Sequence, residues 1–405
     1  MVERPLHAVV LPSTEAGGRL LELLAVALDG TGPAVLPLDP DLPPERLAAI
    51  LDTFVPAAVH TADGVIQRPE AQPAGPDTAV VIATSGSTGP PKGVELSAAA
   101  LRHSAQATLD RVGASPGQRW LLCLPATHIA GIQVLVRSLV AGTDPVVVPR
   151  ADAEVLAGSG CGHVSIVPTQ LRRLLDADPD AGWARGFTSV LLGGAAAPAA
   201  LVDTARAAGV PVLTTYGMSE TCGGCVYDGR PLAGVTVATG DAATDGGRIR
   251  ITGPVLFSGY RERPDLTAAA MDGAWFVTSD LGALGPDGRL TVRGRADDVI
   301  ITGGEKVVAG EVASLLETCP GVREAVVVGR PDPEWGERVT AVIVPDNPAQ
   351  PPTLDLLCRH VRERLPRYAL PRELVLRGTL PMLPSGKPDL ETLRREQSPA
   401  GNVSR

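Results

Sequence analysis

The 405-residue chain has few aromatic residues, no long apolar run and no excess of positive charge. Phe, Trp and Tyr make up only 3% of it, so its cores are expected to be aliphatic. No apolar stretch is long enough to span a bilayer, and the amino terminus lacks the apolar region of a secretory signal, so we expect a cytoplasmic protein with no membrane partner. The formal net charge of −9 argues against nucleic acid as a partner, and local groups must therefore hold any anionic ligand.

Cysteine is also scarce, and the six residues are scattered, which favours reduced thiols. Cys222 and Cys225 form the single close pair, in the order Cys-Gly-Gly-Cys. Such a pair can serve redox chemistry or half of a zinc site, but no second Cys-x-x-Cys or suitably spaced histidine accompanies it. The remaining interpretation is that small residues fill a crowded loop.

The most informative stretch is VVIATSGSTGPPKGV, residues 80–94. Its apolar start predicts a buried parallel strand, and the glycines, hydroxyls and lysine that follow suit a polyphosphate. The predicted phosphate-binding residues are Thr84, Ser85, Gly86, Ser87, Thr88, Gly89 and Lys92. A Walker A loop would need Ser or Thr where Gly93 stands, and Pro90 and Pro91 keep the loop from running straight into a helix. The alternative is a flexible Ser/Gly surface loop.

The middle of the chain has the texture of an α/β domain. Strand-like runs at 145–148, 163–167, 188–192 and 210–214 alternate with helical patterns. This alternation predicts a mostly parallel sheet, whose ligands bind beyond the carboxyl ends of the strands.

Two of those strand ends carry polar or very small residues. Gly193, Gly194 and Ala195 leave room for a flat ring, and the next end has the sequence Tyr216-Gly217-Met218-Ser219-Glu220. There Tyr216 could stack on a base, Ser219 could donate to a phosphate, and Glu220 is a hard oxygen ligand suited to magnesium.

The pattern changes after residue 246. Short alternating strands at 247–292 predict an antiparallel β subdomain, with Asp280 at a strand end where it can accept hydrogen bonds from ribose. The charged, glycine-rich segment 294–306 suggests a boundary between an N-terminal domain, 1–296, and a small mobile α+β domain, 297–405. That small domain ends in Pro-Ser-Gly-Lys, with Lys387 on the turn.

In this order, TSGSTGPPKG, GGA, YGMSET, TSD, GRADD and PSGK resemble the motifs of adenylate-forming enzymes, the family of acyl-CoA synthetases, adenylation domains and luciferases. The resemblance covers residues 80–390. It implies an enzyme that activates a carboxylic acid with ATP and Mg²⁺, releases pyrophosphate and forms an acyl-adenylate, from which a thiol such as coenzyme A displaces AMP. Charge neutralisation by a metal, a lysine and backbone N–H groups suits this chemistry.

The resemblance also implies a role for each matching residue. Lys387 bridges the carboxylate and α-phosphate in the first step, Glu220 holds Mg²⁺, and Ser219 contacts the α-phosphate. Asp280 and Arg295 hold ribose, whereas Tyr216 and Gly193 to Ala195 form the adenine slot. Gly217 and Met218 belong to the same cofactor-binding set. Asp297 matches the hinge of the small domain, and Gly303 and Gly304 match the pantetheine tunnel. The serines at 279 and 219 are mild departures from the family pattern.

The segments LPATHIAGIQVLVRS and GEKVVAGEV are similar to those of o-succinylbenzoate:CoA ligases of menaquinone biosynthesis. By that resemblance His128 gates the acyl pocket and Arg137 receives the second carboxylate of the substrate, while Ala130 replaces a common serine. On an otherwise apolar helix, Arg137 could instead snorkel to the surface.

Three alternatives remain. A stand-alone adenylation enzyme would load a carrier protein, and another aryl- or acyl-CoA ligase would share every motif but Arg137. A catalytically silent nucleotide-binding protein would be expected to have lost Lys387 or Glu220, and both are present. A homo-oligomer is compatible with all of these.

Overall fold

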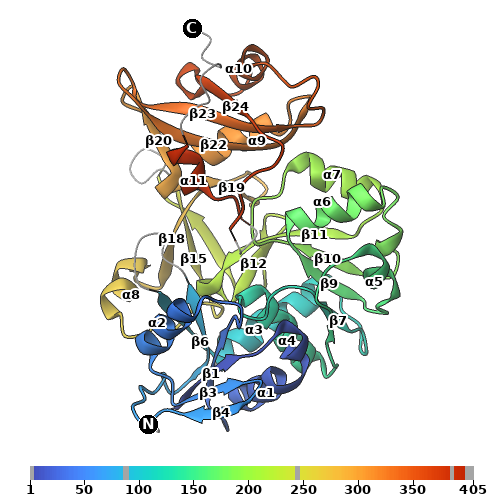
Figure 1. Ribbon diagram of the computed structural model, residues 1–405, viewed down its shortest axis with the longest axis vertical. Coiled ribbons are helices and arrows are strands. Elements are labelled where there is room, and N and C mark those ends of the chain that lie inside the picture. Colours follow the sequence, from blue (N-terminus) through green and yellow to red (C-terminus); the bar gives the residue numbers. More distant parts are fainter. Residues whose placement is uncertain (1–3, 85–90, 242–246, 384–386, 397–405) are drawn as a thin grey trace. The chain divides into compact units, whose positions relative to one another are not determined.

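The computed structural model describes residues 4–84, 91–241, 247–383 and 387–396 (Figure 1). The chain forms two compact units. Unit 1 comprises Met1–Gly194, Ala205–Val237 and Ile251–Phe276, and unit 2 comprises Ala195–Thr204, Ala238–Arg250 and Val277–Arg405. The domain boundary predicted at residue 297 lies inside the segment Val277–Arg405 of unit 2. The hinge at Asp297 therefore stays a prediction.

The first sheet of unit 1 has seven strands in the order β16-β6-β5-β2-β1-β3-β4. Their bounds are Gly259–Tyr260, Lys92–Ser97, Thr78–Thr84, Ala34–Leu38, Leu6–Val10, Ala58–Thr61 and Gly64–Gln67. The central strands β5, β2, β1 and β3 are parallel, and β4, β6 and β16 are antiparallel additions. Every residue of β2 is buried, as expected of a parallel strand covered on both faces.

The second sheet, also seven-stranded, has the order β13-β12-β11-β10-β9-β7-β8. Their bounds are Arg230–Pro231, Gly223–Tyr227, Val212–Met218, Ser189–Leu192, His163–Ile166, Trp120–Leu122 and Val146–Val147. The strands from β11 to β8 are parallel, and β12 and β13 add to them as antiparallel strands. The mostly parallel arrangement is therefore confirmed, but it is built as two sheets.

Helices pack on these sheets. Unit 1 contains α1 (Leu21–Leu28), α2 (Pro44–Phe54), α3 (Ala98–Val112), α4 (Ile129–Ala141), α5 (Ala153–Gly158), α6 (Pro168–Ala177) and α8 (Pro264–Ala270). Helix α7 (Ala199–Ala207) has residues in both units. Of these, α3 and α4 lie side by side (Figure 1). Most of α4 is buried, because its sequence is apolar on nearly every face.

An antiparallel sheet follows, as the alternating pattern after residue 246 predicts. It has the order β14-β15-β18-β17, with β19 paired to β18. The strands are Thr236–Thr239, Arg248–Thr252, Trp275–Leu284, Met271–Asp272 and Leu290–Arg295. The predicted antiparallel β subdomain is thus confirmed.

The C-terminal part of unit 2 is α+β, as expected. Its sheet has the order β21-β20-β23-β22, and β24 pairs with β23. The strands are Glu305–Val308, Val299–Thr302, Gly336–Pro345, Val322–Asp332 and Glu373–Leu376, and the helices are α9 (Ala309–Leu316), α10 (Leu354–Arg362) and α11 (Leu390–Arg395). Val312, Leu316 and Leu357 bury the helices against an aliphatic core.

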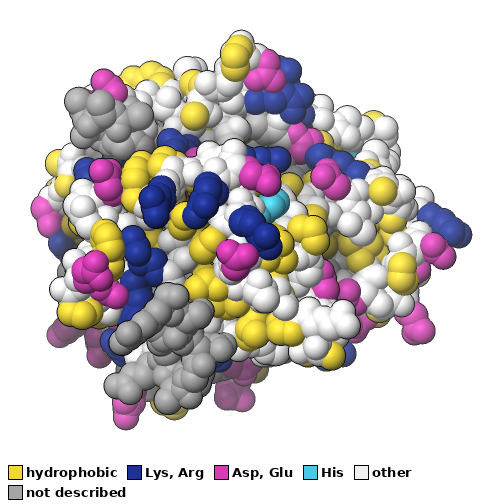
Figure 2. All heavy atoms as spheres, turned by 90° about the horizontal axis from the view of Figure 1, so that it is seen from above, with side chains coloured by type: hydrophobic (Ala, Val, Ile, Leu, Met, Phe, Trp, Pro, Cys, Tyr) yellow, Lys and Arg dark blue, Asp and Glu magenta, His cyan; other side chains and the backbone are white. Residues whose placement is uncertain are grey.

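The surface carries charged side chains of both signs. On the face shown in Figure 2, basic and acidic side chains are interspersed, with apolar side chains between them. Within the described ranges, no helix combines the length and apolar character needed to cross a membrane.

Candidate active site

Two paired strands frame the predicted phosphate-binding segment. β5 runs parallel to β2 on one side and antiparallel to β6 on the other, and Thr84 stands opposite Lys92. The Thr84 hydroxyl donates to the backbone oxygen of Lys92 across 3.2 Å. The segment therefore leads into a strand, and α3 begins only at Ala98. The predicted residues Ser85, Gly86, Ser87, Thr88 and Gly89 lie outside the described part of the chain.

Tyr260 lies beside both Glu220 and Lys92. Glu220 occupies the 3₁₀ turn η4 (Ser219–Thr221) directly after β11. The Tyr260 hydroxyl donates to Glu220 Oε1 across 2.8 Å, and Lys92 Nζ lies 5.7 Å from the centroid of the Tyr260 ring. Burial and the nearby Glu220 carboxylate raise the pKa of Tyr260, which keeps its hydroxyl a neutral donor. The cluster thus combines a fixed carboxylate with a cation.

The Glu220 carboxylate is a suitable ligand for a Mg²⁺ ion that enters bound to a nucleotide. Mg²⁺ in such sites uses one or two carboxylates, and phosphate oxygens and water complete its shell. The described residues contain no group of three or more His, Cys, Asp or Glu side chains that could hold a metal ion. A metal at Glu220 would accordingly draw its other ligands from phosphate and water.

Close packing gives a structural reason for two glycines of the predicted adenine site. A Cβ atom at Gly193 would overlap Thr215 Oγ1, and one at Gly217 would overlap the backbone oxygen of Gly223. These glycines bring β10, β11 and β12 together, with Tyr216 opposite Val226 in the β11–β12 ladder. The nucleotide contacts predicted for the strand ends stay predictions; they involve Gly193, Gly194, Ala195, Tyr216, Gly217, Met218 and Ser219.

The predicted ribose-binding residues are neighbours in unit 2. Asp280 on β18 stands opposite Arg295 on β19, with 3.6 Å between Asp280 Oδ1 and Arg295 Nη1. Arg295 Nη2 also lies 3.0 Å from Oδ2 of Asp297, the predicted hinge residue. The Asp280 side chain is only 14% exposed, so its carboxylate is held in place between the strands.

Two other predicted elements also lie in unit 2. Gly303 and Gly304 form the turn between β20 and β21, with φ values of +59° and +85° that favour glycine. A Cβ atom at Gly303 would lie 2.9 Å from Cε3 of Trp335. Lys387 is exposed, and its backbone oxygen accepts a hydrogen bond from the Leu383 amide across 2.8 Å. The catalytic role of Lys387 stays a prediction.

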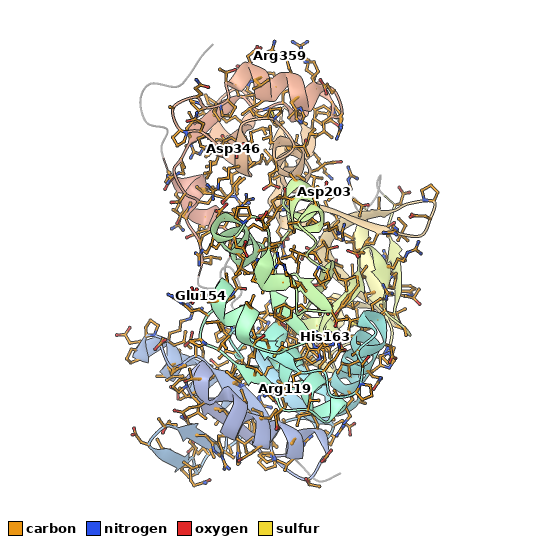
Figure 3. The ribbon with its side chains drawn as sticks, turned by 90° about the vertical axis from the view of Figure 1, so that its right-hand side faces the viewer. Arg119, Glu154, His163, Asp203, Asp346 and Arg359 are labelled. Atoms are coloured by element: carbon orange, nitrogen blue, oxygen red, sulfur yellow. The ribbon has the colours of Figure 1, made fainter. Side chains whose placement is uncertain are left out.

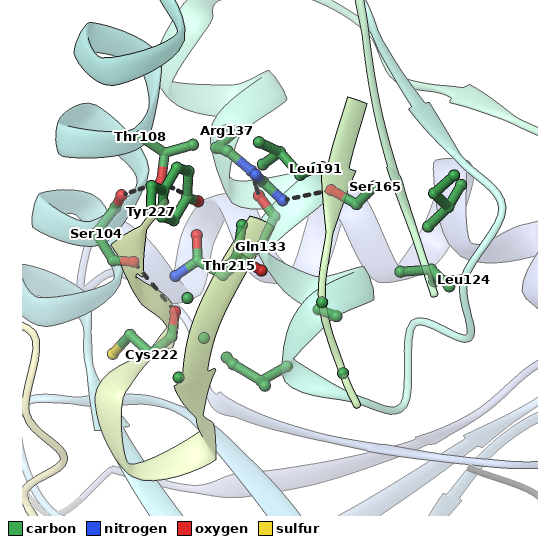
Figure 4. Close-up of a pocket in the computed structure, with 18 of the residues that line it drawn as sticks. Ser104, Thr108, Leu124, Gln133, Arg137, Ser165, Leu191, Thr215, Cys222 and Tyr227 are labelled. Carbon is green, nitrogen blue, oxygen red and sulfur yellow. Dashed lines mark hydrogen bonds between the residues drawn. The ribbon is translucent and has the colours of Figure 1, made fainter. Parts of the chain in front are cut away.

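A pocket opens in unit 1 between α3, α4 and the second sheet (Figure 4). Its lining is Ser104, Thr108, Leu124, Ile129, Ala130, Gln133, Arg137, Ser165, Ile166, Val167, Leu191, Gly193, Gly194, Thr215, Gly217, Cys222, Gly223, Gly224 and Tyr227. Arg137 is only 4% exposed, so the alternative in which it snorkels to the surface is wrong. Its Nε donates to the backbone oxygen of Gln133 across 2.7 Å, and Nη2 donates to Ser165 Oγ across 3.3 Å.

Arg137 is a desolvated cation beside neutral rings. Burial lowers its pKa to about 10, so it remains charged at neutral pH. Arg137 lies over the Trp120 ring, and Trp120 in turn stacks on His163, with 4.7 Å between the two ring centroids. His163 is labelled in Figure 3. Burial, and secondarily Arg137, lowers the pKa of His163 to about 4, so the imidazole is neutral. Among the described residues, Arg137 has neutral oxygens and no carboxylate as partners.

His128 is placed differently from Arg137. It occupies the N-cap position of α4, is exposed, and is not part of the pocket lining, although Ile129 and Ala130 are. Its gating role stays a prediction.

The thiols of Cys222 and Cys225 are fully buried and free. Burial raises the pKa of both, that of Cys225 to about 12, which opposes thiolate chemistry and metal binding. The interpretation as small residues in a crowded place fits this burial, but the place is not a loop: Cys222 ends η4 and Cys225 lies in β12.

Sequence reasoning did not identify the pocket residues Gln133, Ser165 and Tyr227, or Tyr260 beside Glu220. One local signal was available for Gln133. It precedes Arg137 by four residues, a spacing that places both side chains on one face of a helix.

Comparison with known proteins shows the family to which the chain belongs. The family model described as AMP-binding enzyme matches residues 55–261, and that of the AMP-binding enzyme C-terminal domain matches residues 311–387. A probable 2-succinylbenzoate–CoA ligase of Mycobacterium tuberculosis is 47% identical over 331 residues, which cover 79% of this chain and 84% of the relative.

Solved structures with the same fold include o-succinylbenzoate CoA synthetase from Bacillus subtilis in complex with the acyl-adenylate intermediate. The TM-score is 0.81 at 26% identity, covering 98% of this chain and 89% of the other. The same enzyme with ATP and magnesium ion has a TM-score of 0.79 at 26% identity, covering 97% and 90%. An amide bond synthetase from Marinactinospora thermotolerans has a TM-score of 0.84 at 26% identity, covering 97% and 90%. With both family models matched in order and the fold shared, the chain belongs to the AMP-binding enzymes, the adenylate-forming family that its motifs resemble.

Proposed function

We propose that this protein is an ATP-dependent acid:CoA ligase that acts on o-succinylbenzoate in menaquinone biosynthesis. It converts the acid to an acyl-adenylate with release of pyrophosphate, and then to o-succinylbenzoyl-CoA with release of AMP. Buried Arg137, which faces the pocket without a carboxylate partner among the described residues, carries the substrate assignment. The named relatives support the same acid.

The argument for a dicarboxylic acid is electrostatic. Burying a cation is costly unless an anion or a set of hydrogen bonds compensates it. Arg137 has two hydrogen bonds to neutral oxygens and the face of Trp120. A substrate carboxylate that remains after the other has reacted would supply the missing anion, and a guanidinium binds it with charge-assisted hydrogen bonds.

In the adenylation step, this chain would position and neutralise the reacting anions. Lys387 is proposed to hold the attacking carboxylate and the α-phosphate together, and Lys92 to stabilise the departing pyrophosphate. Ser219 would contact the α-phosphate, while Tyr260 holds the Glu220 carboxylate through its hydroxyl. Bound at Glu220, Mg²⁺ would neutralise phosphate charge.

For the nucleotide, Asp280 and Arg295 are proposed to hold the ribose. Their cross-strand pairing keeps the Asp280 carboxylate ready to accept two hydroxyl hydrogen bonds. The adenine is assigned to the glycines at 193 and 194 and to Tyr216.

In the second step, the thiol of coenzyme A attacks the acyl carbon, the bond to the phosphate oxygen breaks, and AMP leaves. Gly303 and Gly304 are proposed to line the path of the pantetheine arm, and Asp297 to act as a hinge between the two steps. A cytoplasmic location fits the supply of ATP and coenzyme A.

The first test is a product analysis by mass spectrometry. The protein is incubated with ATP, Mg²⁺ and CoA, and with o-succinylbenzoate, benzoate, salicylate or a fatty acid in parallel. Formation of o-succinylbenzoyl-CoA and AMP supports the proposal. An adenylate that never reaches CoA would point to a carrier protein or an amine as acceptor. Activity on a different acid alone would refute the substrate assignment.

A further inference from the structure

The side-chain Nε2 of Gln133, which lines the pocket, has no hydrogen-bond partner among the described residues. Gln133 is only 5% exposed, and its Nε2 is buried without a hydrogen bond to the described residues. Its side chain passes Gly223, where a Cβ atom would lie 3.4 Å from Gln133 Cγ. Figure 4 shows it among the residues that line the pocket, on the same helix as Arg137.

The neighbouring polar groups already have other partners. The Ser104 hydroxyl donates to the backbone oxygen of Cys222 across 3.1 Å. The Tyr227 hydroxyl is 3.0 Å from Thr108 Oγ1, and the Thr215 hydroxyl donates to the backbone oxygen of Leu192 across 3.3 Å. A buried amide normally finds a partner, so a water molecule or a bound ligand in the pocket is expected to supply the acceptor.

The chemistry of the amide identifies the kind of acceptor. An NH₂ group is an uncharged donor, which suits a neutral carbonyl oxygen, whereas the adjacent guanidinium of Arg137 suits a carboxylate. Residues four apart on a helix are neighbours on its surface. The Gln133 amide and the Arg137 guanidinium can therefore bind adjacent parts of one ligand. In o-succinylbenzoate, the ketone and the ring carboxylate occupy adjacent ring positions.

We propose that the Gln133 amide donates a hydrogen bond to the ketone oxygen of the acid and thereby selects keto acids over analogues that lack the ketone. This inference rests on the proposed function, since it assumes that the substrate's ring carboxylate pairs with Arg137. Gln133 then acts as a specificity-determining residue that contacts the substrate but takes no part in bond making.

The test compares two acids and two variants. The acids are o-succinylbenzoate and 4-(2-carboxyphenyl)butanoate, in which a methylene replaces the ketone. Gln133→Met keeps the length of the side chain and removes its donors, and Gln106→Met, at an exposed glutamine of α3, is the control. Pyrophosphate release measures kcat/KM for adenylation of each acid.

The full-length protein should prefer the keto acid by about tenfold, as one hydrogen bond allows. Gln133→Met should lose most of that preference through a raised KM for the keto acid, with little change for the methylene analogue. Gln106→Met should keep it. Gln133→Leu gives a second variant if the first does not fold, as judged by thermal unfolding.

Two results would overturn the inference in different ways. Equal losses on both acids, or an unchanged preference, would mean that the Gln133 amide does not recognise the ketone, while the ligase assignment stands. A parent protein that adenylates neither acid would refute the proposed function, and the role of Gln133 would fall with it.

Discussion

The guanidinium carbon of Arg137 lies 4.0 Å from the centroid of the Trp120 indole ring. This is cation–π geometry, and it holds the charged group against an apolar face while its remaining donors point toward the pocket. The arginine is thereby oriented before a ligand binds. An oriented, desolvated cation is a stronger anion receptor than a flexible one at the surface.

Arg137→Ala should raise the KM for o-succinylbenzoate by at least about 30-fold, because truncating a desolvated charge pair typically costs about 2–5 kcal/mol. The KM for ATP should not change. Steady-state kinetics with each substrate varied in turn measures both constants. Arg119→Ala, at an exposed arginine, should behave like the parent protein. An unchanged KM for the acid in Arg137→Ala would indicate that Arg137 is structural.

Lys387→Ala should abolish acyl-adenylate formation yet spare thioester formation from supplied adenylate. The proposed lysine contacts exist only while the carboxylate attacks the α-phosphate, so the second step does not need them. Pyrophosphate release and acyl-CoA formation are measured separately, with Arg359→Ala, at an exposed arginine of α10, as the control. Loss of both steps to the same extent would contradict this role.

Tyr260→Phe should raise the Mg²⁺ concentration needed for half-maximal activity by about tenfold. The variant removes the hydroxyl that bonds to Glu220 Oε1, and losing such a support for a metal ligand typically weakens metal binding by about 10–100-fold. A Mg²⁺ titration at saturating ATP measures the effect. The matched control is Tyr368→Phe, because the Tyr368 side chain is 37% exposed. The same Mg²⁺ dependence in all three proteins would argue against Glu220 as the ligand.

The folded protein should lose stability as the pH falls below the ordinary histidine pKa. Burial lowers the pKa of His163 from 6.5 to about 4, so the unfolded chain binds a proton more readily than the native one between these values. Stability is therefore full above pH 6.5 and falls below it, by about 1.4 kcal/mol from this residue at pH 5.5. The loss levels off once the pH passes below 4.

Urea unfolding at pH 7.5 and pH 5.5 tests this effect. Tryptophan fluorescence is a suitable signal for unit 1, because three of the four tryptophans, Trp120, Trp183 and Trp275, belong to it. His163→Gln should reduce the difference between the two pH values. His103→Gln, at a half-buried histidine of α3, should leave the difference unchanged. An undiminished difference in His163→Gln would show that other groups cause it.

Gly217→Ala should destabilise unit 1, because the added Cβ atom would overlap the backbone oxygen of Gly223. Overpacking of this kind typically costs about 1–3 kcal/mol. Gly186→Ala is the matched control, since a Cβ atom there has no neighbour within 4 Å. Thermal unfolding should give a clearly lower Tm for Gly217→Ala than for Gly186→Ala. Equal Tm values would mean that β12 shifts without cost.

The elements that carry local signals were predictable from the sequence. Helix α3 spans Ala98–Val112 between Ser97 and Gly113, and the Ser97 hydroxyl accepts a hydrogen bond from the Ala100 amide across 3.1 Å. Capping residues mark both ends of such a helix in the sequence itself.

Features that depend on distant partners were not predictable. The parallel strands divide into two sheets, and strand order is set by contacts far apart in the sequence. Lys92–Ser97 carries a charge at two of its six positions, and it forms the strand β6 because its backbone pairs with that of β5. Tyr260 meets Glu220 across 40 residues, so no local pattern links them.

The pairing of Thr84 with Lys92 belongs to the first sheet, whereas the pocket wall that carries Arg137 is a face of α4 beside the second sheet. The predicted phosphate-binding segment and the pocket that holds Arg137 therefore belong to different sheets of unit 1, although Gly193 and Gly194, the residues proposed for adenine, also line that pocket. Under the proposed role of Arg137, substitutions on this face of α4 should alter the preferred acid and leave the strands that frame the predicted phosphate-binding segment in place. This separation makes α4 a natural target for directed evolution of new acid specificities.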